Sequence, residues 1–364
     1  MATLDQWDLI ARKRIENILA TRRISYSSHF EIKISEAGPT HLRAEPHIIN
    51  NALKRMVKAK RIVSYEPTNL PPGDNNPKYY VPLDFKGAAD ASRSRNFVEW
   101  RNLFLRASQR SEYCGYMLEK IIFDAVLETD KYHVLGSAPI YGADGKLMKT
   151  SGSEILTYQG KNVYKAESGA GFDLFTIHKA SHTPIGIEAK NIRDWIYPAS
   201  EEVWRAIARA CTLECLPVII ARKISYISRA GFFAKFGVLG FETNFQYMAH
   251  QIQPDSKYTF KDKVIHKDKL GFADIKLLKP KDPTPIHIVN FFDDILDQHA
   301  ESYFEKFMKH KELLKKYAID YKMAESSLSQ GKRYNLYKQF KEEAEFEDVH
   351  PGVEVTIDAR DIGF

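Results

Sequence analysis

The sequence predicts an α/β (α+β) protein. Three observations predict this class. Apolar residues recur at helical spacing near the N-terminus, short β-like runs broken by turns fill residues 132–192, and mostly helical patterns follow residue 290. The chain has 364 residues, 44% of them hydrophobic, which is enough to bury one large core or two. We therefore expect two or three domains.

The first 86 residues have the element order of a winged helix. Apolar residues follow helical spacing over 5–22, and a second amphipathic stretch covers 46–60. Two strand-like runs then flank residues 66–78, a tip dense in Pro, Gly and Asn. We predict a winged-helix-like DNA-binding domain over residues 1–86, with the tip as its wing.

The helix predicted over 46–60 carries the polar and basic side chains expected of a helix that enters a DNA major groove. The residues with this expected role are Asn50, Asn51, Lys54, Arg55 and Lys58. A solvated helix face that binds only protein is the alternative, and the sequence leaves it open. The formal net charge of +6 fits a polyanionic partner without requiring one.

Composition also predicts where the following domains begin. Residues 87–96 are small and polar and predict a linker, after which a strongly helical segment begins. We place a second domain at 97–260 and a mainly helical C-terminal extension at 261–364, which packs on the core or forms an interface. Within the second domain, Asp-Gly at 144 and 145 and the segment 178–183 predict hairpin turns.

The stretch IGIEAKN, residues 185–191, carries the chemistry. Side chains alternate between the two faces of a strand, so Glu188 and Lys190 share one face. Acid-x-Lys tripeptides recur in the chain, and the tripeptide alone has little specificity. Asp173, however, lies in the preceding β-run, joined to this one by the predicted hairpin. Two adjacent antiparallel strands can bring Asp173 and Glu188 close enough to share a hard divalent cation.

This arrangement resembles the PD-(D/E)XK nuclease superfamily, which has the restriction-endonuclease-like fold. The resemblance implies a core with a mixed central sheet flanked by helices. Asp173 matches the first acidic position, and Glu188-Ala189-Lys190 matches the acid-x-Lys element. A helix at about 200–215 and the apolar strand PVIIAR match the order of the family's core, so the resemblance covers about residues 108–225. Phe172 stands where the family has Pro, and the β insertion before Asp173 is larger than a minimal core needs.

The resemblance implies which residues form the site. Members of the family often carry another acid on the helix before the sheet, and Glu119 matches this position, with Asp124 or Glu128 as weaker alternatives. Asp173, Glu188 and the backbone carbonyl of Ala189 would hold Mg²⁺, which Mn²⁺ could replace. Lys190 would orient or deprotonate the attacking water and offset charge on the phosphorus.

Four further residues are weaker candidates. Asn191 and Arg193 could contact phosphates beside the site, although ordinary surface polarity explains them equally well. His178 and His182 fall in the predicted turn, where we expect solvated histidines rather than ligands or general bases.

The function that the resemblance implies is a Mg²⁺-dependent endonuclease of double-stranded DNA, most plausibly a type II restriction-type enzyme. A recombination, repair or mobile-element nuclease of the same fold is the nearest alternative, and a non-catalytic winged-helix regulator is another. Cleavage of both strands usually calls for two sites, so we expect a homodimer. Three cysteines without a disulfide or metal pattern, and no export or membrane-spanning segment, predict a cytoplasmic protein without membrane contact.

Overall fold

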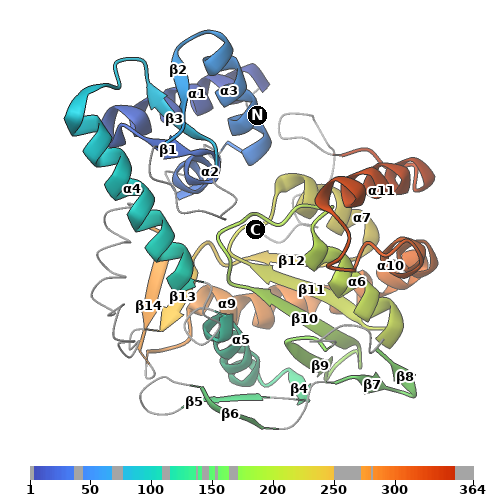
Figure 1. Cartoon of the computed structure of the whole chain (residues 1–364). Coiled ribbons are helices and arrows are strands. Elements are labelled where there is room, and N and C mark those ends of the chain that lie inside the picture. Colours follow the sequence, from blue (N-terminus) through green and yellow to red (C-terminus); the bar gives the residue numbers. More distant parts are fainter. Residues whose placement is uncertain are drawn as a thin grey trace. The chain divides into compact units, whose positions relative to one another are not determined.

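The chain divides into two compact units in the computed structural model (Figure 1). The N-terminal unit contains residues 1–110, 252–275 and 351–354, and the second unit contains 111–251, 276–350 and 355–364. The structure describes residues 4–36, 44–67, 77–108, 115–136, 138–141, 147–151, 155–163, 171–249, 272–279 and 282–348. Helices and mixed sheets together confirm the predicted α+β class.

The N-terminal unit combines helices with a small antiparallel sheet. Its elements are α1 (Leu4–Arg22), β1 (Ser25–Tyr26), α2 (Ser27–Glu36), α3 (Pro46–Lys58), β2 (Ile62–Tyr65), β3 (Tyr79–Pro82) and α4 (Gly87–Ser108). The strand order is β1-β3-β2. The two predicted helices and two predicted strands are present, and α2 with the short strand β1 is added between the helices. Most of the predicted wing, residues 68–76, lies outside the described residues.

Helix α3 shows why this unit folds as it does. Pro46 stands in the first turn, where its missing N–H has no helical partner to lose. Ile49, Leu53 and Met56 follow at helical spacing and are buried against α1. The opposite face of α3 is therefore left to polar residues.

Residues 87–96, which the sequence predicted as a linker, form the first half of helix α4. The prediction was wrong because small residues were taken as a sign of flexibility, whereas Ala is the strongest helix former and no Pro interrupts the segment. Asp90 stabilises the first turn, since its carboxylate accepts the backbone N–H of Lys86 at 3.0 Å and pairs with Arg23 at 3.0 Å. The boundary between the units accordingly lies near Arg110 and not at residue 96.

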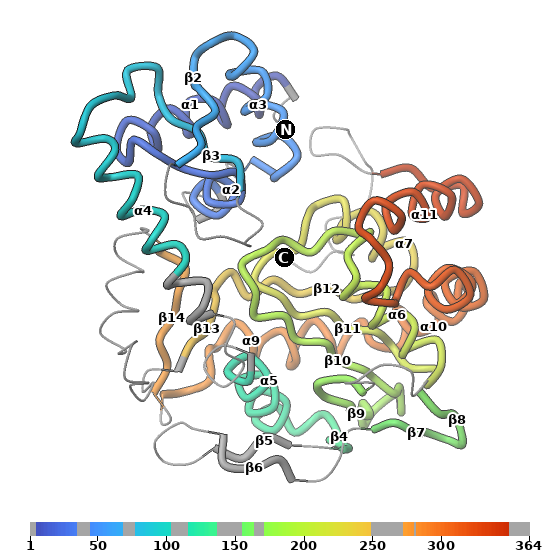
Figure 2. Tube along the Cα trace, in the orientation of Figure 1, coloured from blue at the N-terminus to red at the C-terminus, as the bar shows by residue number. Residues whose placement is uncertain are grey.

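A five-stranded mixed sheet forms the centre of the second unit, in the order β12-β11-β10-β9-β4. Its strands are β4 (Tyr132–Leu135), β9 (Leu174–His178), β10 (Pro184–Lys190), β11 (Leu216–Ala221) and β12 (Leu239–Glu242). Strands β4, β9 and β10 are antiparallel neighbours, whereas β10, β11 and β12 run parallel. Figure 2 traces β9 and β10 as a hairpin, which confirms the predicted turn between them.

Helices connect and cover this sheet. Helix α5 (Gly115–Thr129) precedes β4 and packs against β4 and β10, and α6 (Glu201–Leu213) joins the parallel strands β10 and β11. The C-terminal part of the unit is mainly helical. It comprises α9 (Ile286–Asn290), a π-helical stretch (Phe291–Leu296), α10 (Asp297–Lys315), a second π-helical stretch (Lys316–Asp320) and α11 (Gln330–Glu343). Helix α10 packs on α6 and β11, so these helices form one compact unit with the sheet.

Smaller elements complete the second unit. They are β5 (Ala138–Tyr141) with β6 (Leu147–Ser151), β7 (Thr157–Tyr158) with β8 (Lys161–Asn162), a π-helical stretch (Ile227–Phe233), α7 (Ala234–Phe236), and β13 (Gln246–Ala249) with β14 (Ile275–Leu278). Strands β5 and β6 pair antiparallel around the predicted Asp-Gly turn, whose residues lie outside the described ones.

The core of the second unit lies between α6, the sheet and the C-terminal helices. Trp204, Ile219, Phe232 and Phe307 are fully buried in it, as large apolar side chains from distant parts of the chain. Cys211 is buried in the same core as a free thiol, in line with its spacing on a helix. None of the helices in the described ranges has both the length and the apolar character needed to cross a bilayer.

Candidate active site

The β9–β10 hairpin brings the predicted acids together. Ile187 pairs with Leu174, and one further step of this antiparallel register places Glu188 opposite Asp173. The Asp173 carboxylate accepts the backbone N–H of Ala189 at 2.7 Å, which fixes its side chain against β10. Both carboxylates therefore lie at the same end of the hairpin, as the sequence predicted.

Glu188 is held by two cationic side chains. Its side chain is only 4% exposed. The ammonium of Lys190 lies 2.6 Å from Oε1, and Nη1 of Arg209 on α6 donates to Oε2 at 2.6 Å. A buried carboxylate needs such partners, because an unpaired charge in the interior is strongly unfavourable. The Glu188 carboxylate is thus oriented from its own strand and from the following helix.

Asp173 has the opposite environment. Burial and the charges of Glu188 and Glu119 together raise the pKa of its carboxyl group to about 8, against the opposing effects of Lys190 and of the N–H of Ala189. Without an added cation this acid is therefore largely protonated at neutral pH. An acid kept from ionising beside a second acid is a frequent sign of a functional site.

Lys190 is a cation in this site. Burial alone would lower the pKa of its ammonium, but the Glu188 and Asp173 carboxylates outweigh that effect and raise the pKa. Its side chain is 24% exposed, so the ammonium reaches the edge of the site while its partner Glu188 stays inside. The group can bind or orient an anion or a water, and it is a poor base as long as both acids face it.

Glu119 on α5 belongs to the same cluster. It is half-buried, and its charge acts on Asp173 strongly enough to raise the pKa of that carboxyl group. The weaker alternatives have other partners, since Asp124 pairs with Lys120 and the exposed Glu128 accepts a hydrogen bond from Thr284. Among the three acids predicted on this helix, the structure favours Glu119.

Phe172 and Gly186 pack beneath the site. A methyl group added at Gly186 would lie 2.3 Å from the Phe172 ring, so only glycine leaves room for this side chain. The guanidinium of Arg209 lies 5.9 Å from the centre of the same ring. The Phe172 ring therefore packs against Gly186 on one strand and the Arg209 guanidinium on α6.

Asn191 and Arg193, predicted to contact phosphates, do not have that role in the structure. Asn191 is buried, donates to the carbonyl of Tyr247 at 2.6 Å and accepts its N–H at 3.0 Å. Arg193 is also buried at 9% exposure, and its carbonyl accepts a hydrogen bond from Arg222. The predictions failed because both residues are buried just after β10. The Asn191 amide forms there the two hydrogen bonds with the Tyr247 backbone that a neighbouring strand would otherwise form.

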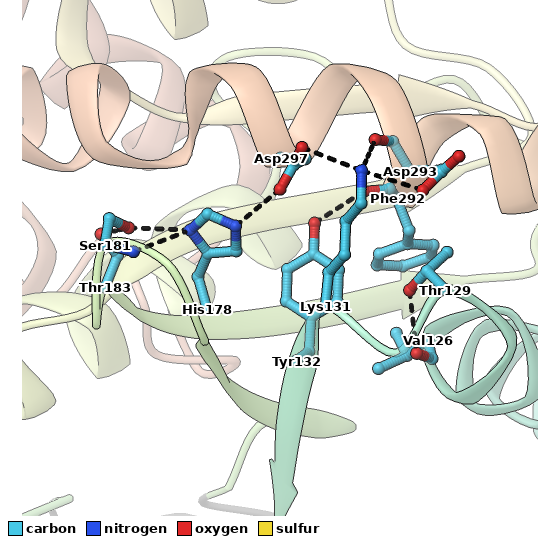
Figure 3. A network of polar contacts seen from close by, with 10 residues as sticks. All are labelled: Val126, Thr129, Lys131, Tyr132, His178, Ser181, Thr183, Phe292, Asp293 and Asp297. Carbon is cyan, nitrogen blue, oxygen red and sulfur yellow. Dashed lines mark hydrogen bonds and ion pairs between the residues drawn. The ribbon is translucent and has the colours of Figure 1, made fainter.

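His178 is likewise not the solvated turn residue that the sequence predicted. It is buried, and its Nε2 lies 2.8 Å from Oδ1 of Asp297 on α10, while its Nδ1 lies 2.8 Å from Oγ of Ser181 (Figure 3). The covering helix α10 comes from far along the chain, so the turn sequence carries no sign of it. His182, in the same turn, is exposed as predicted.

The predicted DNA-reading residues lie on α3 of the N-terminal unit. Asn51, Lys54, Arg55 and Lys58 are exposed and follow helical spacing along one face. Asn50 is half-buried and donates to Glu31 at 2.8 Å, which removes it from that exposed face.

Arg209 is the site residue that the sequence prediction missed. Arg205 and Arg209 stand one turn apart in the helix that follows the acid-x-Lys strand. The helix between two parallel strands packs against the sheet, so a cation on it can reach an acid of β10. An arginine in this helix is therefore a signal in the sequence that predicts a partner for Glu188.

The donor set fits a hard cation such as Mg²⁺. In the described ranges no three His, Cys, Asp or Glu side chains are arranged to hold a metal between them. Mg²⁺ binds through one or two carboxylates and keeps several waters, and Asp173 with Glu188 offers two. The raised pKa of Asp173 is the observation that supports the fit, since a bound cation would replace its proton.

No family model, curated protein or solved structure compared with this chain matches it. What the site can do therefore rests on its own groups. It combines the buried carboxylate of Glu188, the half-buried acid Asp173, a third acid nearby, an ammonium at the rim and an arginine that orients Glu188. Such a site can bind a divalent cation and an anion beside it.

Proposed function

We propose that this chain is a Mg²⁺-dependent endonuclease of double-stranded DNA, of the restriction type, with a PD-(D/E)XK core in its second unit. The observation that carries the proposal is the placement of Asp173, Glu188 and Lys190 at one end of the β9–β10 hairpin, with Asp173 held protonated by burial and by a neighbouring acid. Such an arrangement lowers stability unless a cation binds there.

The topology of the second unit also supports the proposed PD-(D/E)XK core. Helix α5, the antiparallel strands β4, β9 and β10, helix α6 and the parallel strand β11 follow each other in the helix, sheet, helix, strand order of that core. Fold alone does not set function, so the proposal depends on the side chains at the end of β10.

Each residue would have a distinct role. Asp173, Glu188 and the carbonyl of Ala189 would hold the cation. Bound Mg²⁺ would polarise a phosphate oxygen and lower the pKa of a water. Lys190, as an ammonium, would orient the attacking water and offset the charge that develops on the phosphate.

Two residues would support these groups. Glu119 would add a third acid beside Asp173, on whose pKa it acts. Arg209 would keep Glu188 in the orientation that presents a carboxylate oxygen to the cation.

The N-terminal unit would help to find and read the DNA target. Its order α1, β1, α2, α3, β2, β3 is that of a winged helix, and α3 would enter the major groove. Asn51, Lys54, Arg55 and Lys58 are exposed there on one face. Arg55 also pairs with Asp8 at 3.3 Å, a contact that DNA phosphates could replace.

A homodimer is part of this proposal. Each chain would carry one site, and cleavage of both strands calls for two sites related by two-fold symmetry. Light scattering that shows only monomers, with and without DNA, would remove this part and leave the catalytic assignment in place.

The experiment compares purified wild type with Glu188→Ala on mixed plasmid and phage DNA, with Mg²⁺ or with EDTA. Glu301→Ala, at an exposed acid of α10, is the matched control. We expect discrete fragments from wild type and control that require Mg²⁺ and disappear with Glu188→Ala. Inert wild type that still binds duplex DNA tightly would favour the non-catalytic regulator.

A further inference from the structure

A second candidate site lies in the same unit, in a groove whose residues include none of the catalytic candidates. The groove has a volume of about 790 Å³. Its lining comes from the π-helical stretch before α7, from α7, from α10 and from the chain after α11. The side chains that could bind a ligand there are Lys235, His299, Ser302, Lys306, Lys309 and His310.

Helix α10 supplies a continuous polar stripe to this groove. His299, Ser302, Lys306 and His310 recur at intervals of three and four residues, which places them along one face of the helix. The stripe from His299 to His310 is about 16 Å long at a rise of 1.5 Å per residue. Imidazole, hydroxyl and ammonium groups are all common phosphate contacts, and the stripe contains all three.

The positive charge of the groove is not neutralised by acids. Within the described part of the chain, no carboxylate forms an ion pair with Lys235, Lys306 or Lys309. Lys306 donates to the carbonyl of Ala234 at 3.1 Å and Lys235 to that of Glu345 at 3.3 Å, and a carbonyl carries no net charge. Glu347 is the one acid among the described residues that line the groove.

The pKa of His310 reflects the positive electrostatic potential of the groove. Burial lowers the pKa of its imidazole, and the charges of Lys309, Lys235 and Lys306 lower it further. The charges of three lysines disfavour protonation of this histidine, and the same positive potential favours the binding of an anion.

We propose that this groove binds the phosphodiester backbone of DNA. Duplex DNA presents one phosphate per 3.4 Å of helix axis on each strand, so a stripe of about 16 Å spans about five phosphates of one strand. A single small phosphate would leave most of this stripe unused. The choice of DNA as the polyanion rests on the proposed function, whereas the affinity for phosphates rests on the groove itself.

The test measures binding of the full chain to a fluorescent DNA duplex in EDTA, so that cleavage is not involved. The salt dependence of binding counts the phosphates contacted, with a slope of about 0.9 per phosphate. Lys306→Glu/Lys309→Glu reverses two charges in the groove. Lys332→Glu/Lys338→Glu is the control, because it reverses two exposed lysines on α11, outside the groove lining, and changes the net charge equally.

We expect the groove variant to reduce the salt slope by about 2 and the affinity by about tenfold or more, with the control close to wild type. Equal losses in the two variants would show only long-range charge and would overturn the proposal, as would an unchanged groove variant. Lys306→Gln/Lys309→Gln replaces the reversal if that variant fails to fold. A wild type that does not cleave DNA in Mg²⁺ but shows the groove effect in EDTA would overturn the proposed function and leave the groove in place, so the two failures are distinguishable.

Discussion

Strand β9 has a charged cluster at each end, and the two clusters differ in how completely their charges are paired. At the C-terminal end of β9, His178 contacts Asp297, and the ammonium of Lys131 bridges the carboxylates of Asp297 and Asp293 at 2.9 Å each (Figure 3). Hydrogen bonds to Asp293 and Asp297 raise the pKa of Lys131. Burial acts to raise the pKa of Asp297, but the hydrogen bonds from Lys131 and His178 and the charges of these two residues together lower it. Every charge there is stabilised by its neighbours.

The cluster before β9 is different, because one of its acids is disfavoured in its charged form. Asp173 faces Glu188 and Glu119, and its pKa is raised to about 8 by burial first and by these acids next. The comparison suggests that the Asp297 cluster serves stability and the Asp173 cluster serves ligand binding. Substitutions in the Asp173 cluster should therefore lower activity more than stability, and substitutions in the Asp297 cluster should lower stability more than activity.

The largest expected effect is that of Asp173→Asn on cleavage. The variant removes a carboxylate proposed to bind the cation, so we expect the rate of plasmid cleavage to fall on the order of a thousandfold. Its melting temperature at neutral pH should be equal to or above that of wild type, because residue 173 then has no proton to release when the chain unfolds. Asp194→Asn, at an exposed acid of the following loop, is the control. Full activity in Asp173→Asn would end the proposed role.

Arg209→Ala should have the next largest effect. Arg209 bonds Glu188 directly, and loss of such a partner typically lowers metal affinity or activity about 10- to 100-fold. We expect the Mg²⁺ concentration for half-maximal cleavage to rise, and Arg209→Lys to restore part of the activity. A purely structural role would instead lower the melting temperature and leave the Mg²⁺ dependence unchanged. Arg205→Ala, one turn away and paired with Glu201, is the control.

The sequence was sufficient for the parts of the site that depend on one hairpin. Asp173, Glu188 and Lys190 follow from strand alternation and from a turn of a few residues, both of which are local. Arg209 depends on how α6 docks over β10, and docking is set by the whole core. The sequence predicted no such contact.

His178 and Asn191 show the same limit from the other side. Both follow a local pattern that predicts exposure, yet α10 covers His178 and the Gln246–Ala249 strand covers Asn191. Burial of a polar residue by a segment far along the chain cannot be seen in its own neighbourhood. The first half of α4 was missed for a local reason, since small residues such as Ala and Ser occur both in linkers and in helices.

The pH dependence of stability offers a test of the raised pKa without any substrate. The folded protein holds the Asp173 proton up to about pH 8, whereas the unfolded chain releases it near the ordinary value of 3.8. Between these values the folded state binds more protons, so this group makes the free energy of unfolding fall as pH rises from about 4 to about 8. Denaturant unfolding in EDTA should show this fall in wild type relative to Asp173→Asn.

Mg²⁺ should reverse that trend if it binds where we propose. The cation binds the ionised carboxylates, so its stabilising effect should grow as pH rises and should be absent from Asp173→Asn. A difference between wild type and Asp173→Asn that stays constant from about pH 4 to about pH 8 would contradict the raised pKa.

The smallest expected effect is that of Asp297→Asn, and it should appear in stability alone. The substitution weakens the contacts to Lys131 and His178, and hydrogen bonds to charged groups contribute about 1.5 to 3 kcal/mol, so we expect a loss of that size in the free energy of unfolding. Asp294→Asn, at an exposed acid nearby in the chain, should change stability by less than about 0.5 kcal/mol. Cleavage per folded molecule should match wild type at saturating Mg²⁺. A fall in cleavage at unchanged stability would instead mean that both ends of β9 take part in the reaction, and that full pairing of charges does not mark a structural cluster in this protein.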